Sequence, residues 1–216
     1  EAAYFLKSCY RDFPVGTVHV AVVDPGVGSA RRALIAKSER YFFLAPDNGL
    51  LTHVLADDGE MEVREIENAE YRPTSPGRTF DGRDLFAPAA ARLTKQQLFS
   101  SYGPLVTDCK TFAILKPTGE STAVVGEIVY VDRFGNLISN IRRSHVEESQ
   151  SILKRLNPLI RVAGHMINGL VNSYSEGHPQ VPHALINSDG QIEVFVKEGN
   201  AAITINVGRG QRVDLL

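Results

Sequence analysis

The sequence is poor in cysteine, has no excess of basic residues and contains no long apolar run. Its 216 residues include two cysteines, Cys9 and Cys109, too few for a disulfide framework, which favours a reducing, cytoplasmic compartment. The formal net charge of −2 gives no sign of nucleic-acid binding, and no apolar stretch approaches membrane-spanning length. With 43% hydrophobic residues, the composition is that of an ordinary globular protein.

No metal site is predicted, because the histidines are scattered without the spacing of metal ligands. We expect them to be solvated or to lie in the core: His19, His53, His145, His165, His178 and His183.

The first half of the chain alternates apolar strand patterns with helical ones. The run Val18–Val23 predicts a buried strand, because it is rich in β-branched residues and ends at Asp24-Pro25-Gly26. Further strands are predicted at Ala33–Lys37, Tyr41–Ala45 and Glu62–Ile66, helices at Leu50–Leu55 and from near Phe86 (capped by Asp84) to Leu93, and a loop at Glu67–Arg78. This alternation predicts an α/β domain over residues 1–116, with a mainly parallel sheet.

An amphipathic helix is predicted at the start, with Ala2, Phe5, Leu6 and Cys9 on one face. Because Glu1 falls inside this pattern and is not a methionine, we expect a preceding segment that carries a first strand and helix of the domain.

The second half, residues 117–216, consists mostly of short β-branched segments separated by turn signals. Strands are predicted at Glu127–Val131, Leu137–Ile141, Leu159–Val162, Ala184–Asn187, Ile192–Val196, Ala202–Asn206 and Arg212–Leu215, with a helix at Glu147–Leu156. This pattern predicts a smaller all-β, barrel-like domain.

Four stretches place polar residues beside glycine: Asp24–Arg32, Pro46–Gly49, Thr79–Asp84 and Val131–Asn140. Each alone has a structural explanation, such as a turn or a surface ion pair. Gly26-Val27-Gly28 allows a phosphate-loop interpretation, but the lysine of a P-loop and the full dinucleotide fingerprint are both absent. A phosphate-handling enzyme is therefore the weakest of the functional hypotheses.

Taken together, these stretches resemble the S-adenosylmethionine (SAM) hydroxide adenosyltransferases, the hydrolase relatives of fluorinase and chlorinase. The resemblance runs from Glu1 to Leu216 through five ordered blocks: VDPGVG followed by arginine, APDNGLL, TF-x-GRD-x-FAPAAA, VDRFGNLISNI and INSDGQIEVFVKEGNAA. It implies an α/β domain followed by a β-barrel-like domain, and a homotrimer with active sites between the N-terminal domain of one subunit and the C-terminal domain of its neighbour. The implied reaction converts SAM and water to adenosine and L-methionine, without a cofactor because SAM is the substrate.

The resemblance also assigns catalytic residues. Asp24 and Arg31 match the family's aspartate and arginine, which position and activate the attacking water. Asp81 stands where the family usually has histidine. A second carboxylate near Asp24 would raise one of the two pKa values by like-charge repulsion. We therefore expect reduced activity, or a pH profile that differs from that of the histidine-bearing relatives.

The substrate-binding residues are implied by the same blocks. Phe80 and Gly82 would line the ribose pocket, and Asp132 and Ser188 would hold the amino and carboxylate ends of methionine. The adenine would contact Asn136, Phe134, Tyr174 and the backbone near Ala201 and Ala202.

Two alternatives remain open from the sequence. A SAM-dependent halide transferase is less favoured, because Arg32 to Ala45 leaves no room for the long fluorinase insertion. A non-catalytic adenosine- or SAM-binding protein would keep the pocket but be silenced by Asp81 or by loss of the N-terminal segment, which carries the family's ribose-binding aspartate.

Overall fold

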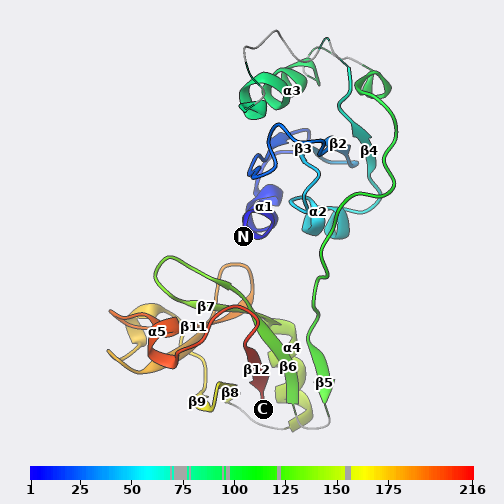
Figure 1. Cartoon of the computed structure of the whole chain (residues 1–216). Helices are drawn as coiled ribbons and strands as arrows, with labels where there is room; N and C mark the ends of the chain where they lie inside the picture. Colours follow the sequence, from blue (N-terminus) through cyan, green and yellow to red (C-terminus); the bar gives the residue numbers. More distant parts are fainter. Residues whose placement is uncertain are drawn as a thin grey trace. The chain divides into compact units, whose positions relative to one another are not determined.

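The computed structural model describes residues 1–68, 70, 77, 79–93, 95, 98–120, 123–153 and 157–216 (Figure 1). The chain divides into two compact units, Glu1–Ile114 and Leu115–Leu216. This division falls two residues before the boundary predicted from the sequence.

Unit 1 is built on a four-stranded sheet with the order β1-β3-β2-β4. Its strands are β1 (Val18–Val20), β2 (Ala33–Lys37), β3 (Phe42–Pro46) and β4 (Glu62–Glu65). Only the β1–β3 pairing is parallel among these strands; β2 pairs antiparallel with both β3 and β4. The prediction of a mainly parallel sheet therefore fails for the described strands. The reason is the short turn from Ser38 to Tyr41, since so short a connection can only join antiparallel neighbours.

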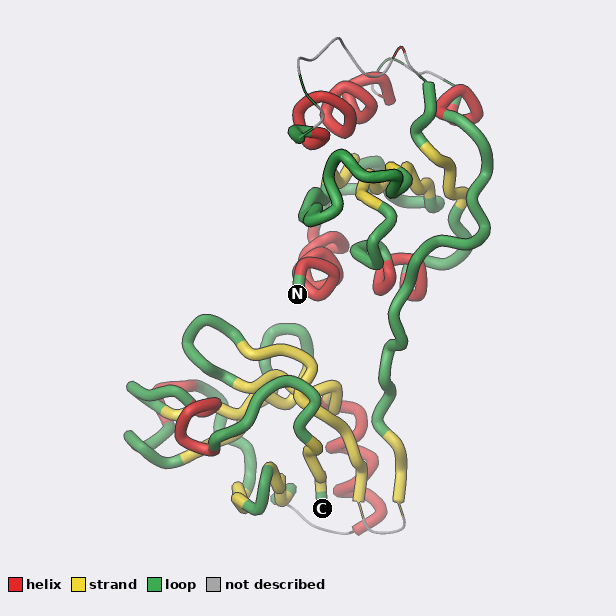
Figure 2. The backbone as a smooth tube through the Cα atoms, viewed as in Figure 1, coloured by secondary structure: helices red, strands yellow, loops and turns green. Residues whose placement is uncertain are grey.

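Helices cover both faces of this sheet (Figures 1 and 2). Helices α1 (Ala2–Cys9) and α2 (Thr52–Asp57) pack on one face and α3 (Ala87–Leu93) on the other. Along β2, Leu34 and Ala36 lie on the first face, whereas Ala33 and Ile35 lie on the second. This alternation is that of a strand buried on both sides. Short helical turns occur at η1 (Tyr10–Asp12), η3 (Gly82–Phe86) and η4 (Phe99–Tyr102).

Two details of the first strand and helix differ from the prediction. Strand β1 is an edge of the described sheet, and Val20, Val22 and Val23 are 37–56% exposed, so the valine run is not a buried core strand. In α1 the buried residues are Ala3 and Leu6, whereas Phe5 is half exposed. A β-branched run has the same composition at an edge as at the centre of a sheet, and only its partners distinguish the two.

Unit 2 is a curved antiparallel sheet in the order β10-β11-β7-β6-β12-β8-β9, with β5 paired to β6. Its strands are β5 (Thr118–Glu120), β6 (Ala123–Val131), β7 (Leu137–Arg142), β8 (Leu159–Val162), β9 (His165–Asn168), β10 (Pro182–Ile186), β11 (Gln191–Val196) and β12 (Arg212–Leu215). The end strands β9 and β10 lie near each other, which gives the sheet its barrel-like character.

The unit also contains helices, so the prediction of an all-β domain was too simple. Helix α4 (Arg143–Leu153) begins before the predicted Glu147–Leu156, whose last three residues lie outside the described part. The segment predicted as a strand at Ala202–Asn206 is helix α5 (Ala201–Ile205), and η5 (Tyr174–Glu176) is a further helical turn. The Asn200 side chain caps α5 by accepting the Ile203 N–H, which overrides the β propensity of its isoleucines. Within the described ranges, no helix is both long and apolar enough to cross a bilayer.

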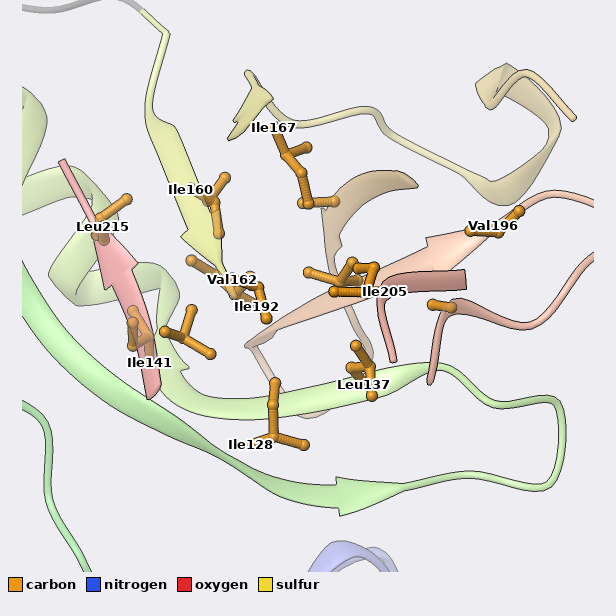
Figure 3. Close-up of a cluster of buried hydrophobic side chains, with 14 of the residues drawn as sticks. Ile128, Leu137, Ile141, Ile160, Val162, Ile167, Ile192, Val196, Ile205 and Leu215 are labelled. Carbon is orange, nitrogen blue, oxygen red and sulfur yellow. The ribbon is translucent and has the colours of Figure 1, made fainter. Parts of the chain in front are cut away.

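The core of unit 2 is aliphatic (Figure 3). Ile128, Leu137 and Ile192 are fully buried and pack in the same cluster as Ile160 and Val162 from β8. This packing fixes β7, which follows the turn that carries Asp132 and Asn136, and β11, which carries Glu193.

Candidate functional site

Arg31 connects two buried carboxyl groups in unit 1. Its Nε and Nη2 donate to Asp24 Oδ2 at 2.8 and 2.5 Å, and the same Nη2 donates to Asp81 Oδ2 at 2.5 Å. The two acceptor oxygens therefore lie within about 5 Å of each other. All three side chains are 5–8% exposed. The structure thus brings together the three residues predicted as catalytic.

The turn between Asp24 and Arg31 produces this contact. The N–H of Val27 donates to the Asp24 carbonyl, and the Ser29 hydroxyl donates to the Gly26 carbonyl at 2.6 Å. Gly28 has a φ of +80°, which glycine adopts without steric cost. The chain therefore folds back and presents Arg31 to the carboxylate seven residues before it.

Asp81 comes from a widened helical turn. The N–H of Ala87 donates to the Gly82 carbonyl, the i→i+5 pattern of a π turn over Gly82–Phe86. This pattern brings residues five apart close together: Asp81 binds Arg31, and the Phe86 ring lies under the same guanidinium at 5.5 Å. The sequence analysis missed Phe86, although its aromatic side chain five residues after Asp81 was the available signal. Asp84 was predicted to cap a helix. In the structure it lies inside the π turn instead, where it is buried and ion-paired with Arg83.

One oxygen of this cluster has no partner within the described residues: the buried Oδ1 of Asp24. Burial alone would lower the pKa of Arg31, but its hydrogen bonds to Asp24 and Asp81 outweigh that effect, and the pKa is raised. Arg31 therefore stays charged and holds Oδ2 of Asp24. An unsatisfied buried acceptor costs stability, so Oδ1 is the natural place for a donor such as water.

The Pro46–Gly49 stretch binds the residues on either side of the turn between Asp24 and Arg31. The Asn48 side-chain amide donates to the carbonyl of Val23, the residue before Asp24. Asp47, which is 2% exposed, accepts from Arg32 through Oδ2 and from the N–H of Lys110 through Oδ1. Hydrogen bonds to Asp108 and Asp47 raise the pKa of Arg32. This stretch therefore holds both ends of the turn from Asp24 to Arg32, a role that its sequence alone did not indicate.

The two predicted ribose-pocket residues lie beside Asp81. Phe80 is 61% exposed and stacks with the Arg83 guanidinium at 5.0 Å. A Cβ on Gly82 would lie 3.8 Å from Val22, so the π turn passes close to the chain that leads to Asp24. A separate apolar cavity of about 500 Å³ in unit 1 is lined by Phe5, Val22 and Val23 but by none of the three catalytic candidates.

In unit 2, Asp132 organises the turn between β6 and β7. Its Oδ1 accepts the N–H groups of Phe134 and Asn136 at 2.8 Å, and its Oδ2 accepts from the Asn136 side-chain amide at 3.0 Å. Phe134 is left 76% exposed at the tip of the turn. The carbonyl of Gly135 accepts the N–H of Ala202, which joins the turn to α5.

The two residues predicted to contact adenine through their backbone lie at the start of α5. The N–H of Ala202 donates to the Gly135 carbonyl, and the Ala202 carbonyl accepts the N–H of Val207. The adenine-binding role of Ala201 and Ala202 stays a prediction.

Tyr174 and Ser188 share a polar cavity of about 360 Å³. The Tyr174 hydroxyl donates to Glu193 Oε1 at 2.6 Å, and its ring packs edge-on against Phe195. Burial, the hydrogen bond to Glu193 and the charges of Glu193 and Asp132 raise the pKa of Tyr174. Ser188 lies in the turn between β10 and β11. The sequence analysis missed Glu193, whose position in a hydrophobic strand was the only available signal.

Known proteins match along the whole chain. The family models for the N-terminal and C-terminal domains of SAM hydroxide adenosyltransferase match residues 1–103 and 126–214. The (R)-S-adenosyl-L-methionine hydrolase of Thermus thermophilus is 36% identical over all of this chain and 82% of its own length. The fluorinase of an Actinoplanes species is 30% identical over 69% of this chain and 59% of its own length.

A solved structure matches as well. The crystal structure of an uncharacterized conserved protein from Thermotoga maritima has a TM-score of 0.85 and 32% identity, and it covers 99% of this chain and 82% of that chain.

Proposed function

The chain belongs to the SAM hydroxide adenosyltransferase family, and from this membership we propose that it hydrolyses SAM to adenosine and L-methionine. The observation that carries the proposal is the buried Asp24–Arg31 pair with its unengaged Oδ1. The reaction needs no acid at the leaving group, because a sulfonium leaves as a neutral thioether. Its difficulty is to align a weak nucleophile with the ribose C5′, which is the task of a fixed hydrogen-bond acceptor.

In the proposed step, Asp24 Oδ1 accepts a hydrogen bond from a water molecule while Arg31 holds Oδ2. The water oxygen attacks C5′, the C5′–S bond breaks, and its electron pair goes to sulfur. The water proton passes to Asp24 and then to solvent. Asp81 accepts a hydrogen bond from the same Nη2, so it shares the guanidinium with Asp24.

The charge of the cluster favours water over halide. Two carboxyl groups share one guanidinium, and the unengaged atom is a carboxylate oxygen. A halide ion placed there would be repelled, whereas water can donate to it. This observation supports hydrolysis over the halide transfer of the fluorinase relatives.

The predicted residues fall into two sets on different units, and we propose a homotrimer in which sets from neighbouring subunits complete each site. The catalytic set comprises Asp24, Arg31, Asp81, Phe80 and Gly82. The substrate-end set comprises Asp132, Phe134, Asn136, Tyr174, Ser188, Ala201 and Ala202. Both cysteines are free, in keeping with a cytoplasmic location.

Product identification tests the reaction. We expect incubation with SAM to yield adenosine and methionine in equal amounts, with or without added chloride or fluoride. Chromatography of the nucleoside decides between the candidates. A 5′-halogenated nucleoside would show halide transfer, and binding of adenosine without turnover of SAM would show a non-catalytic protein.

Replacing Asp81 by histidine tests the departure from the family pattern. We expect the Asp81→His variant to hydrolyse SAM about tenfold faster at pH 8, a barrier reduction of about 1.4 kcal/mol, because a neutral imidazole removes the second carboxyl group from Arg31. Its rate should fall as the pH drops through about 6.5, where an imidazole becomes charged. The measurement is kcat against pH for both proteins.

Glu39→His is the matched control, since Glu39 is exposed in the β2–β3 turn. It should leave the rate and the pH profile unchanged. If Asp81→His also leaves both unchanged, the identity of residue 81 has no part in catalysis.

A further inference from the structure

Glu193 is a buried carboxylate beside the unit 2 cavity. It is 4% exposed and lies on β11, opposite Ile138 on β7. Each of its carboxylate oxygens accepts a hydrogen bond from a neutral side chain: Oε1 accepts the Tyr174 hydroxyl at 2.6 Å, and Oε2 accepts the Asn187 amide at 3.2 Å. A buried carboxylate held by neutral donors costs stability and suggests a role beyond packing.

The two donors belong to different walls of the cavity. Tyr174 lies in η5. Asn187 begins the turn that carries Ser188, and its Oδ1 accepts the N–H groups of Asp189 and Gln191 at 3.1 and 3.0 Å. Asn187 therefore shapes the turn, and Glu193 holds Asn187. One carboxylate thus fixes an aromatic ring and a polar turn that are separated by more than ten residues in the chain.

We propose that Glu193 is a positioning residue that holds the Tyr174 ring and the Ser188 turn at a fixed spacing in the cavity, and so sets the affinity for the nucleoside and amino-acid ends of the substrate. The inference rests on the proposed function, which assigns those ends to Tyr174 and Ser188. Glu193 itself needs no contact with the substrate. Without its two hydrogen bonds, the Tyr174 ring and the Ser188 turn would become mobile. The substrate would then have to order both on binding, which would lower its affinity.

The kinetic test compares Glu193→Gln and Glu193→Ala with wild type. Glutamine keeps the size of the side chain and one acceptor oxygen, whereas alanine removes both hydrogen bonds. We expect KM for SAM to rise about threefold in Glu193→Gln and about tenfold or more in Glu193→Ala, with kcat within about twofold of wild type, because only binding is affected. A purely structural role would lower the active fraction, and hence kcat, without changing KM.

A spectroscopic test monitors the hydrogen bond between Tyr174 and Glu193 directly. The Glu193 hydrogen bond and charge help to raise the pKa of Tyr174, so the phenol should ionise at lower pH in Glu193→Gln. Burial still raises the pKa of Tyr174 in this variant, so ultraviolet difference titration should show one tyrosine that ionises at lower pH than in wild type but does not become an ordinary exposed phenol. The double variant with Tyr174→Phe should lose this signal. The exposed Glu198→Gln is the matched control and should behave as wild type in both tests.

The outcomes separate this inference from the proposed reaction. If wild type does not hydrolyse SAM, the proposed reaction fails, and the inference is judged by the Kd for adenosine in calorimetry, which should weaken in the same order as KM. The inference is overturned if Glu193→Gln and Glu193→Ala both leave KM, or that Kd, at the wild-type value. It is also overturned if the tyrosine titration of Glu193→Gln is unchanged.

Discussion

The Asp24→Asn variant is expected to lose about 10²- to 10⁴-fold in kcat for SAM hydrolysis while unit 1 remains folded. Asparagine has nearly the same shape and keeps an oxygen that can accept from Arg31 Nε and Nη2. It cannot take the proton of an attacking water. The loss should therefore appear in kcat, and the affinity for adenosine should stay within about twofold of wild type.

Initial rates of adenosine release and a thermal unfolding curve measure the two parts of this prediction. Asp108→Asn is the matched control, because Asp108 also pairs with an arginine but its side chain is 78% exposed. Surface ion pairs contribute little, so this control should keep its activity and its melting temperature. If Asp24→Asn retained a third or more of the wild-type rate, Asp24 would not be the base.

Arg31→Met is expected to destabilise unit 1 by roughly 3–5 kcal/mol, the usual cost of removing one partner from a buried ion pair. Methionine fills part of the space but leaves two carboxyl groups within about 5 Å of each other, each about 5% exposed, without a cation. The folded variant would then hold protons on these groups more tightly than the unfolded chain does. Its stability deficit should therefore shrink as the pH is lowered toward about 4.

Urea unfolding at pH 7 and pH 5, for wild type and variant, tests both statements. Arg209→Met serves as the control, because it also removes a guanidinium but from an exposed position in unit 2. We expect it to leave the unfolding free energy at the wild-type value. An Arg31→Met protein as stable as wild type at pH 7 would show that the carboxyl groups do not need the guanidinium.

Local sequence patterns predicted strands whose side chains are mostly buried, whatever the distance of their partners along the chain. The strands at Ala33–Lys37, Leu159–Val162 and Arg212–Leu215 have the predicted bounds. Patterns failed where a distant partner or a single side chain decides the structure. The valine run around Val20 is exposed because it is a sheet edge, and Ala201–Ile205 is helical because of the Asn200 cap.

In the candidate site, too, the sequence identified some residues, and only the tertiary structure revealed the others. The resemblance pointed to Asp24, Arg31 and Asp81, and the structure joins Arg31 to a carboxylate fifty residues away. Phe86 and Glu193 were missed because both resemble ordinary core positions in the sequence. Phe86 matters because the Arg31 guanidinium lies over its ring, and Glu193 matters because its carboxylate accepts the Tyr174 hydroxyl. Both contacts depend on tertiary structure.

The π turn over Gly82–Phe86 makes the cluster of Asp24, Arg31 and Asp81 sensitive to chain length as well as to residue identity. Deleting one residue from this turn would let it relax to an ordinary α-helix, in which residues five apart point in different directions. Arg31 could then keep either the Asp81 carboxylate or the Phe86 ring, but not both. Mutant libraries aimed at a different nucleophile should therefore vary side chains here and hold the number of residues constant.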